Sequence, residues 1–191
     1  TWLMNLEISS LFIMSRRFYR IKYIPEVVWI FTRFIYLPRI LIQTHMIDFY
    51  NMSYASEYTS KFLLWFIYLL GIVWSSEMIG ITINPLCITG LASFAPILSP
   101  IHIPLAITTV IHHSNWKIGD TLDRVMVFIY ICWAIYNCYH SVVFWICFAM
   151  FALLGTRTRN ITDRSWENMY NLFTHALGHY VAGLGIYFGM L

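Results

Sequence analysis

Long apolar segments recur through the last two-thirds of this chain, and they constrain its fold more than any other feature. The hydrophobic content is 59%, and only 11% of the residues are charged, against roughly 25% in soluble domains. Backbone polar groups within lipid must be satisfied inside the protein, which leaves helices or closed barrels. These runs are too continuous for barrel strands, which alternate. We therefore predict an all-α, polytopic membrane helical bundle over residues 61–191. Its apolar runs are 62–74, 86–98, 101–113, 125–139, 142–154 and 169–191.

We predict four to six membrane segments. The exact number stays open, because two stretches have alternative interpretations. The run 62–74 is too short to span alone, and it crosses a bilayer only if Glu77 lies at an interface or is paired. The run 125–154 is either one long kinked helix or two short spans, divided at His140 and Ser141. The turn at Ser99 and Pro100 separates two further runs.

Residues 1–60 form a separate N-terminal arm with shorter apolar runs and prolines at 25 and 38. Proline is tolerated in a first helical turn, so Pro25 is predicted to begin a helix, and Pro38 is predicted to break one. We expect two or three amphipathic helices that lie on a membrane face or against a partner. The alternative is a solvated arm that becomes ordered only on assembly.

The net charge and the cysteine spacing exclude some classes of function. A formal charge of +3 is not typical of nucleic-acid-binding proteins, and the basic residues near segment ends suit contacts with lipid headgroups. Four cysteines lie in apolar segments without CxxC spacing. We expect them to be buried thiols rather than zinc ligands or disulfides; they are Cys87, Cys132, Cys138 and Cys147.

The most polar patch within the apolar region is 111–124, and it carries the first candidate site. His112 precedes Asp123 by eleven residues, so on one continuous helix the two would share a face about 16 Å apart. Titratable groups beside membrane-spanning sequence are costly and mark functional sites. The alternative is a hydrated loop at the membrane edge.

The spacing of His112 and Asp123 resembles the second transmembrane helix of the cytochrome b anchor subunits of succinate dehydrogenase (respiratory complex II). Trp74, Ser75, Ser76 and Glu77 are similar to the entry of the first helix in the small anchor. The large anchor is a competing match, through His112, Asn115 and Asp123, but the segment from Trp74 to Glu77 favours the small anchor. Arg124 stands where the small anchor has a tyrosine that contacts ubiquinone.

This resemblance implies an anchor subunit in the mitochondrial inner membrane without catalytic residues of its own. Its partners would be a second anchor subunit, an iron–sulfur subunit and lipids. His112 would be a haem b ligand, and a ubiquinone site would lie near Asp123 and Arg124. His113 and Trp116 complete the expected cofactor-binding residues.

A second candidate site is formed by His175 and His179, four residues apart in the last apolar run. Histidines at this spacing lie on one helix face and can bind one metal ion. With His112 and Asp123 they resemble the membrane zinc hydrolases of the alkaline ceramidase and adiponectin-receptor superfamily. The resemblance implies a zinc site of His112, His175 and His179. Thr108 takes the place of the family's serine, and 51 residues separate Asp123 from His175, fewer than the family's intervening helices require.

A third hypothesis is a non-catalytic accessory subunit of a large mitochondrial respiratory complex. The aromatic-rich N-terminal arm favours it, because aromatic side chains suit packing against partner subunits and anchoring at lipid interfaces.

Overall fold

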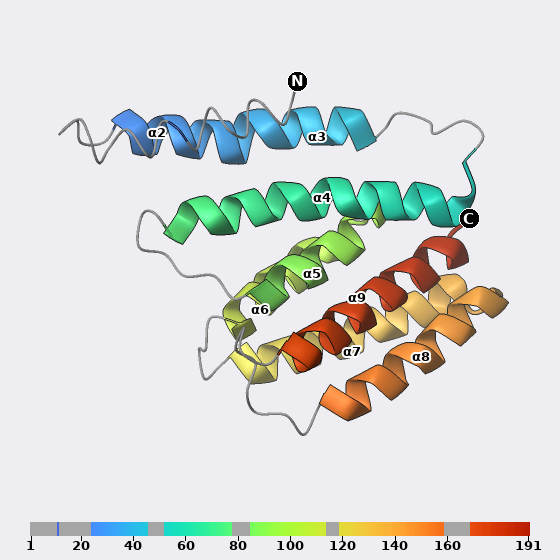
Figure 1. Cartoon of the computed structure of the whole chain (residues 1–191). Coiled ribbons are helices and arrows are strands. Elements are labelled where there is room, and N and C mark those ends of the chain that lie inside the picture. Colours follow the sequence, from blue (N-terminus) through green and yellow to red (C-terminus); the bar gives the residue numbers. More distant parts are fainter. Residues whose placement is uncertain (1–10, 12–23, 46–51, 78–84, 114–118, 159–168) are drawn as a thin grey trace.

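The computed structural model describes residues 11, 24–45, 52–77, 85–113, 119–158 and 169–191, and throughout these ranges the regular secondary structure is helical. This confirms the all-α prediction. Figure 1 shows α2 and α3 alongside α4, with the remaining helices on the other side of α4 and inclined to it. The helices are α2 (Ile24–Phe31), η1 (Thr32–Tyr36), α3 (Leu37–His45), α4 (Tyr54–Glu77), α5 (Pro85–Phe94), η2 (Ala95–Ile97), α6 (His102–His113), α7 (Gly119–Cys138), α8 (Val142–Thr158) and α9 (Met169–Gly189).

The first three of these elements form one continuous rod, which we call the N-terminal rod (residues 24–45). The rod begins next to Pro25, as predicted, but the break predicted at Pro38 is wrong. Proline normally crowds the carbonyl one turn earlier and removes a hydrogen bond. Here the preceding turn, η1, is a π-helix, in which the Leu37 N–H donates to the Thr32 carbonyl. This wider turn shifts the hydrogen-bond register before the proline, so the helix continues.

The N-terminal rod buries two polar residues, Arg33 and His45, whereas Arg39 and Gln43 are exposed. Arg33 and His45 are 1% and 4% exposed, whereas Phe31 and Ile35 are 54% and 59% exposed. The inner face packs on α4, where the Tyr68 hydroxyl donates to the Arg33 carbonyl. Buried Arg33 beside exposed apolar side chains is expected of a helix surrounded by lipid, whereas the exposed Arg39 is expected at its polar edge or in water. The segment Val27–His45 is also long and apolar enough to cross a membrane.

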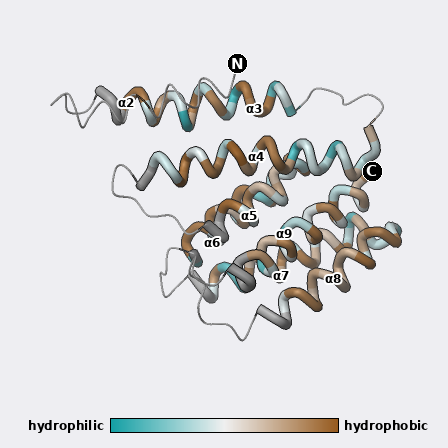
Figure 2. Tube along the Cα trace, viewed as in Figure 1, coloured by the Kyte–Doolittle hydropathy of each residue, from teal (hydrophilic) through white to brown (hydrophobic). Residues whose placement is uncertain are grey.

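Helix α4 is longer than the apolar run that predicted it. It begins at Tyr54, where the Ser53 side chain accepts the Ser56 N–H and caps the first turn. At 24 residues it is about 36 Å long, against about 30 Å for the hydrocarbon core of a bilayer. Tyr54–Ser75 is the second segment with the length and apolarity of a membrane span. Figure 2 shows hydrophobic positions along α4 and along the shorter helices α8 and α9.

Helices α5 and α6 form a helical hairpin beneath α4 (Figure 1). The chain reverses after η2, with Leu98 in a left-handed conformation at φ 48°, and the Ser99 carbonyl accepts the His102 N–H at 3.0 Å. The turn predicted at Ser99 and Pro100 is therefore confirmed. The first turn of α5 and the last turn of α6 therefore lie on the same side of the bundle.

The run 125–154 forms two helices, α7 and α8, rather than one long kinked helix. The Ser141 side chain accepts the Phe144 N–H at 3.3 Å and caps α8. Helix α8 then packs along α9. The prediction of buried thiols is correct for Cys138 and Cys147 but wrong for Cys132, which α7 turns outward; the side chain of Cys87 lies outside the described residues.

Candidate functional site

Gly90 of α5 lies against His179 of α9 and Thr109 of α6, and these two side chains contact further polar residues on α9 and α7. We call this group the Gly90 cluster; its other members are Thr89, Thr109, Asp123, His175 and His179.

Helix α9 supplies the histidine pair of the Gly90 cluster. The rings of His175 and His179 lie edge to face with their centroids 4.5 Å apart, and both side chains are partly buried. The prediction that they share one helix face is confirmed.

Helix α5 contacts the His179 ring through Thr89 and Gly90. The Thr89 hydroxyl lies 3.1 Å from Nδ1 of His179, within hydrogen-bond distance. A Cβ atom added to Gly90 would lie 3.3 Å from Cε1 of His179, tighter than most real contacts of this kind. The absence of a side chain at residue 90 therefore lets the imidazole rest against the backbone of α5.

Helices α6 and α7 complete the cluster. Thr109 Oγ1 donates to Asp123 Oδ1 at 3.4 Å, and the Thr109 methyl carbon lies 3.7 Å from the Cβ position of Gly90. Asp123 is thus linked through Thr109 to the residue on which His179 rests. The fold brings together residues that lie as far apart in the chain as Thr89 and His179.

His112 and Asp123 do not lie on one helix, so the prediction of a shared face about 16 Å apart is wrong. Helix α6 ends at His113 and α7 begins at Gly119. Ser114, Asn115 and Gly119 all favour helix ends over helix interiors, a signal that the spacing argument ignored. His112 is partly buried in the last turn of α6, one helical turn after Thr109.

The other residues predicted for cofactor binding have different positions. Arg124 is exposed on α7. Trp116 and the side chain of His113 lie outside the described residues. Thr108 is buried on α6, and its hydroxyl donates to the Leu105 carbonyl of the preceding turn at 3.0 Å.

The donor atoms of the Gly90 cluster are of the kind that zinc prefers, namely imidazole nitrogen and carboxylate oxygen. Within the described ranges, however, no three histidine, cysteine, aspartate or glutamate residues are grouped closely enough to hold a metal ion together. Among the described residues, the histidine pair on α9 therefore does not form a three-ligand metal site with a neighbouring histidine, cysteine or acid.

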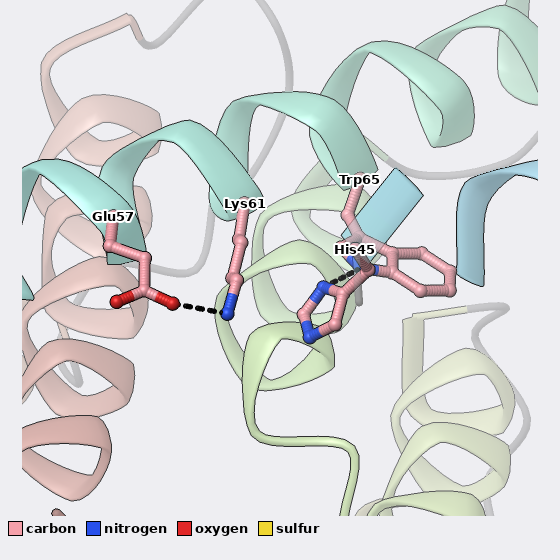
Figure 3. Close-up of polar contacts among 4 residues, drawn as sticks. All are labelled: His45, Glu57, Lys61 and Trp65. Carbon is pink, nitrogen blue, oxygen red and sulfur yellow. Dashed lines mark hydrogen bonds and ion pairs between the residues drawn. The ribbon is translucent and has the colours of Figure 1, made fainter. Parts of the chain in front are cut away.

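A second polar cluster, which the sequence reasoning missed, lies at the beginning of α4 (Figure 3). Lys61 Nζ lies 2.5 Å from Glu57 Oε1, and the two side chains are only 12% and 20% exposed. Lys61 also lies over the Tyr187 ring of α9, 5.7 Å from its centroid. The i, i+4 spacing of an acid and a base was the signal available in the sequence.

Beside this ion pair, His45 connects α3 to α4. Trp65 Nε1 donates to His45 Nδ1 at 3.4 Å. His45 is the last residue of α3, so it fastens the end of the N-terminal rod to the bundle. The sequence offers no spacing from which this contact could be foreseen.

Comparisons with known proteins leave the interpretation to the geometry described above. The chain matches no protein family, no functionally characterised protein and no solved structure.

Proposed function

We propose that this chain is a membrane-embedded, zinc-dependent hydrolase that cleaves an amide bond in a lipid. The observation that carries the proposal is the Gly90 cluster: His179, paired with His175, and Thr109, hydrogen-bonded to Asp123, both lie against Gly90. These are residues of the kind that the resemblance to the alkaline ceramidase superfamily requires.

The metal would be held by His175, His179 and His112. Two of these residues, His175 and His179, are already in contact on α9. His112 is partly buried in the last turn of α6 and would be the third ligand. When bound, zinc would supply an activated water at neutral pH.

Asp123 would act on the proton of that water. Thr109 donates a long hydrogen bond of 3.4 Å to this carboxylate, and a carboxylate can accept several hydrogen bonds at once. A carboxylate near an activated water can accept a proton and then return it to the leaving amine.

A lipid substrate is supported by the surroundings of the cluster. Two segments, Val27–His45 and Tyr54–Ser75, are long and apolar enough to cross a membrane, and large apolar side chains cover the outside of the other helices. We include α7, α8 and α9 in a polytopic bundle, because Phe128, Leu153 and Phe173 are 67%, 69% and 66% exposed, which is costly in water.

Zinc content and hydrolysis test this proposal together. The purified chain in detergent should retain about one zinc ion and cleave a fluorogenic N-acyl lipid. His175→Ala and His179→Ala should lose both properties, because each removes a proposed ligand. His140→Ala is the matched control, since His140 is exposed in the turn between α7 and α8, and it should retain both. Full zinc content in His175→Ala and His179→Ala would refute the site.

The anchor-subunit hypothesis remains a prediction from sequence, and its residues can be checked in the same preparation. Trp74, which supported it, is 72% exposed at the end of α4. A b-type haem absorbance that disappears in His112→Ala, together with co-purified succinate dehydrogenase activity, would favour the anchor over the hydrolase.

A further inference from the structure

Contacts between helices define two ends of the bundle. The rings of Tyr54 and Phe188 lie edge to face, with their centroids 6.1 Å apart. A Cβ atom added to Gly189 would touch Cβ of Cys138. Helix α4 therefore begins at the end of the bundle where α7 and α9 finish, which we call the C-terminal end of the bundle.

Helix α5 points toward the C-terminal end of the bundle, because it runs in the same direction as α9. Gly90 of α5 lies against the ring of His179. About one turn further along both helices, the Ser93 carbonyl lies against Gly183. Since α9 finishes at the C-terminal end of the bundle, α5 begins at the opposite end.

Helix α6 returns along α7 to that opposite end. Close to the turn, His102 Nε2 lies 2.8 Å from the Tyr130 hydroxyl, and two turns later Thr109 contacts Asp123 near the beginning of α7. Helix α6 has 12 residues and is about 18 Å long, against about 30 Å for the hydrocarbon core of a bilayer. The turn lies beside Tyr130, about 12 Å before the end of α7 at Cys138.

The turn between α5 and α6 satisfies backbone groups within the hairpin. The Leu98 N–H donates to the Ala95 carbonyl at 3.1 Å, and the His102 N–H donates to the Ser99 carbonyl at 3.0 Å. The Ser99 N–H lies 3.1 Å from Nδ1 of His102, which can accept it. Water satisfies such groups at a solvated turn, whereas a turn at membrane depth needs partners inside the protein.

The His102 side chain connects this turn to α7. Its Nδ1 also lies 2.9 Å from the Ser99 carbonyl oxygen. In one tautomer the ring accepts from the Ser99 N–H and donates to the Tyr130 oxygen; in the other it donates to the Ser99 carbonyl and accepts from the Tyr130 hydroxyl. Both ring nitrogens therefore have a partner in either tautomer. The Phe94 ring stacks on the imidazole, with the centroids 5.9 Å apart.

The outer face of the hairpin is apolar. Ile103, Ile107 and Val110 follow one another at helical spacing along α6, and all three are exposed, as is Leu98 in the turn. A continuous apolar surface of this kind is costly in water, whereas it suits contact with acyl chains.

We propose that α5 and α6 form a re-entrant hairpin, which enters and leaves the membrane through the face opposite the C-terminal end of the bundle. His102 locks its turn against the middle of α7, and its outer face contacts acyl chains. These two helices then add no crossing of the bilayer. The inference is independent of the proposed zinc site, because it concerns the depth of the turn and uses none of the proposed metal ligands.

Cysteine labelling in sealed proteoliposomes tests the depth of the turn. A membrane-impermeant maleimide is applied after a pore-forming peptide has admitted it to both faces, and mass spectrometry identifies the labelled peptides. Ser53→Cys and His140→Cys report on the C-terminal end of the bundle, and Thr121→Cys, in the first turn of α7, reports on the opposite end; all three residues are exposed. We expect these controls to be labelled rapidly and Leu98→Cys to be labelled only after denaturation in detergent.

Labelling of Leu98→Cys as fast as Ser53→Cys would place the turn in water and overturn the proposal. If Leu98→Cys does not fold, Pro100→Cys gives the same comparison, since Pro100 is also exposed in the turn.

Hydrogen–deuterium exchange in the same proteoliposomes tests the lock. Tyr130→Phe removes only the hydroxyl that reaches His102, and Tyr136→Phe is the matched control, because Tyr136 is an exposed tyrosine of the same helix. Losing one hydrogen bond should raise the population with an open turn by about 2- to 10-fold, and amide exchange of the turn follows that population. We expect this acceleration in the peptide spanning residues 98–103 with Tyr130→Phe and no change with Tyr136→Phe. Equal exchange in the two variants, or equal acceleration in every peptide of Tyr130→Phe, would refute the lock.

Discussion

Helix α9 packs closely against the rest of the bundle at a glycine, Gly183. Gly183 faces the carbonyl of Ser93 and the hydroxyl of Tyr58, and a Cβ atom at this position would overlap both. The Tyr58 hydroxyl is itself committed, since it donates to the Ser93 carbonyl at 2.9 Å. Tyr58 is fully buried, so neither neighbour can move aside easily.

Gly183→Ala is therefore expected to destabilise the protein by about 1–3 kcal/mol, the usual cost of overpacking. Gly155→Ala is the matched control, because a Cβ atom there would meet nothing within 4 Å, and it should be neutral or slightly stabilising. Thermal unfolding in detergent measures both. Equal midpoints for the two variants would show that α9 can shift away from Ser93.

The candidate site could be predicted from the sequence only in part, and the reason lies in single residues. The i, i+4 spacing of His175 and His179 indicated a shared face, which is a local property of a helix. Thr89 lies 90 residues before His179, and nothing in its own sequence neighbourhood marks it as a partner. Gly90 is equally unremarkable in sequence, because its role depends on the approach of another helix.

At the scale of the elements, the Glu57–Lys61 ion pair of α4 lies at the contact between α4 and α9. Lys61 contacts both Glu57 of its own helix and the Tyr187 ring of α9. Removing one partner of a largely buried ion pair leaves the other charge poorly solvated, which costs more than removing both.

Glu57→Gln is thus expected to lower stability by about 1–3 kcal/mol, since it leaves the Lys61 ammonium with only neutral partners. The double variant Glu57→Gln with Lys61→Met should regain most of this loss. The comparison is made by thermal unfolding of the single and double variants in the same detergent. A double variant that is as unstable as the sum of its single changes would contradict a coupled pair.

The helix boundaries also show where sequence reasoning failed and why. Hydrophobicity located the core of α4 but omitted its first two turns, which are polar and depend on the Ser53 cap. Pro38 was expected to end a helix because proline usually does, but η1 widens the turn before it. A π-turn has no strong sequence signal, so this outcome could not be read from residue preferences.

At the scale of the whole molecule, the placement of apolar side chains predicts which surfaces meet lipid. Cys132 lies outward on α7, whereas Cys138 and Cys147 are buried inside the bundle. If the outside of α7 faces acyl chains, the Cys132 thiol is shielded from water although no protein covers it.

In intact membranes, we expect Cys132 to be protected from a water-soluble maleimide and to react once detergent denaturation exposes it. Ser53→Cys provides a positive control, because Ser53 is exposed just before α4, and it should be labelled whenever its side of the membrane is accessible. Mass spectrometry of the labelled peptides distinguishes the sites. Rapid labelling of Cys132 in intact membranes would place the middle of α7 in contact with water.

The arrangement of polar groups in the N-terminal rod has a consequence for biogenesis. Arg33 and His45 point toward α4 and are almost completely buried, so the rod would present both to acyl chains if it entered the bilayer by itself. Inserting an isolated arginine costs several kcal/mol, and that cost falls only when a neighbouring helix covers it. The rod and α4 are therefore expected to leave the insertion machinery as a helical pair, with the first segment retained until the second has been synthesised.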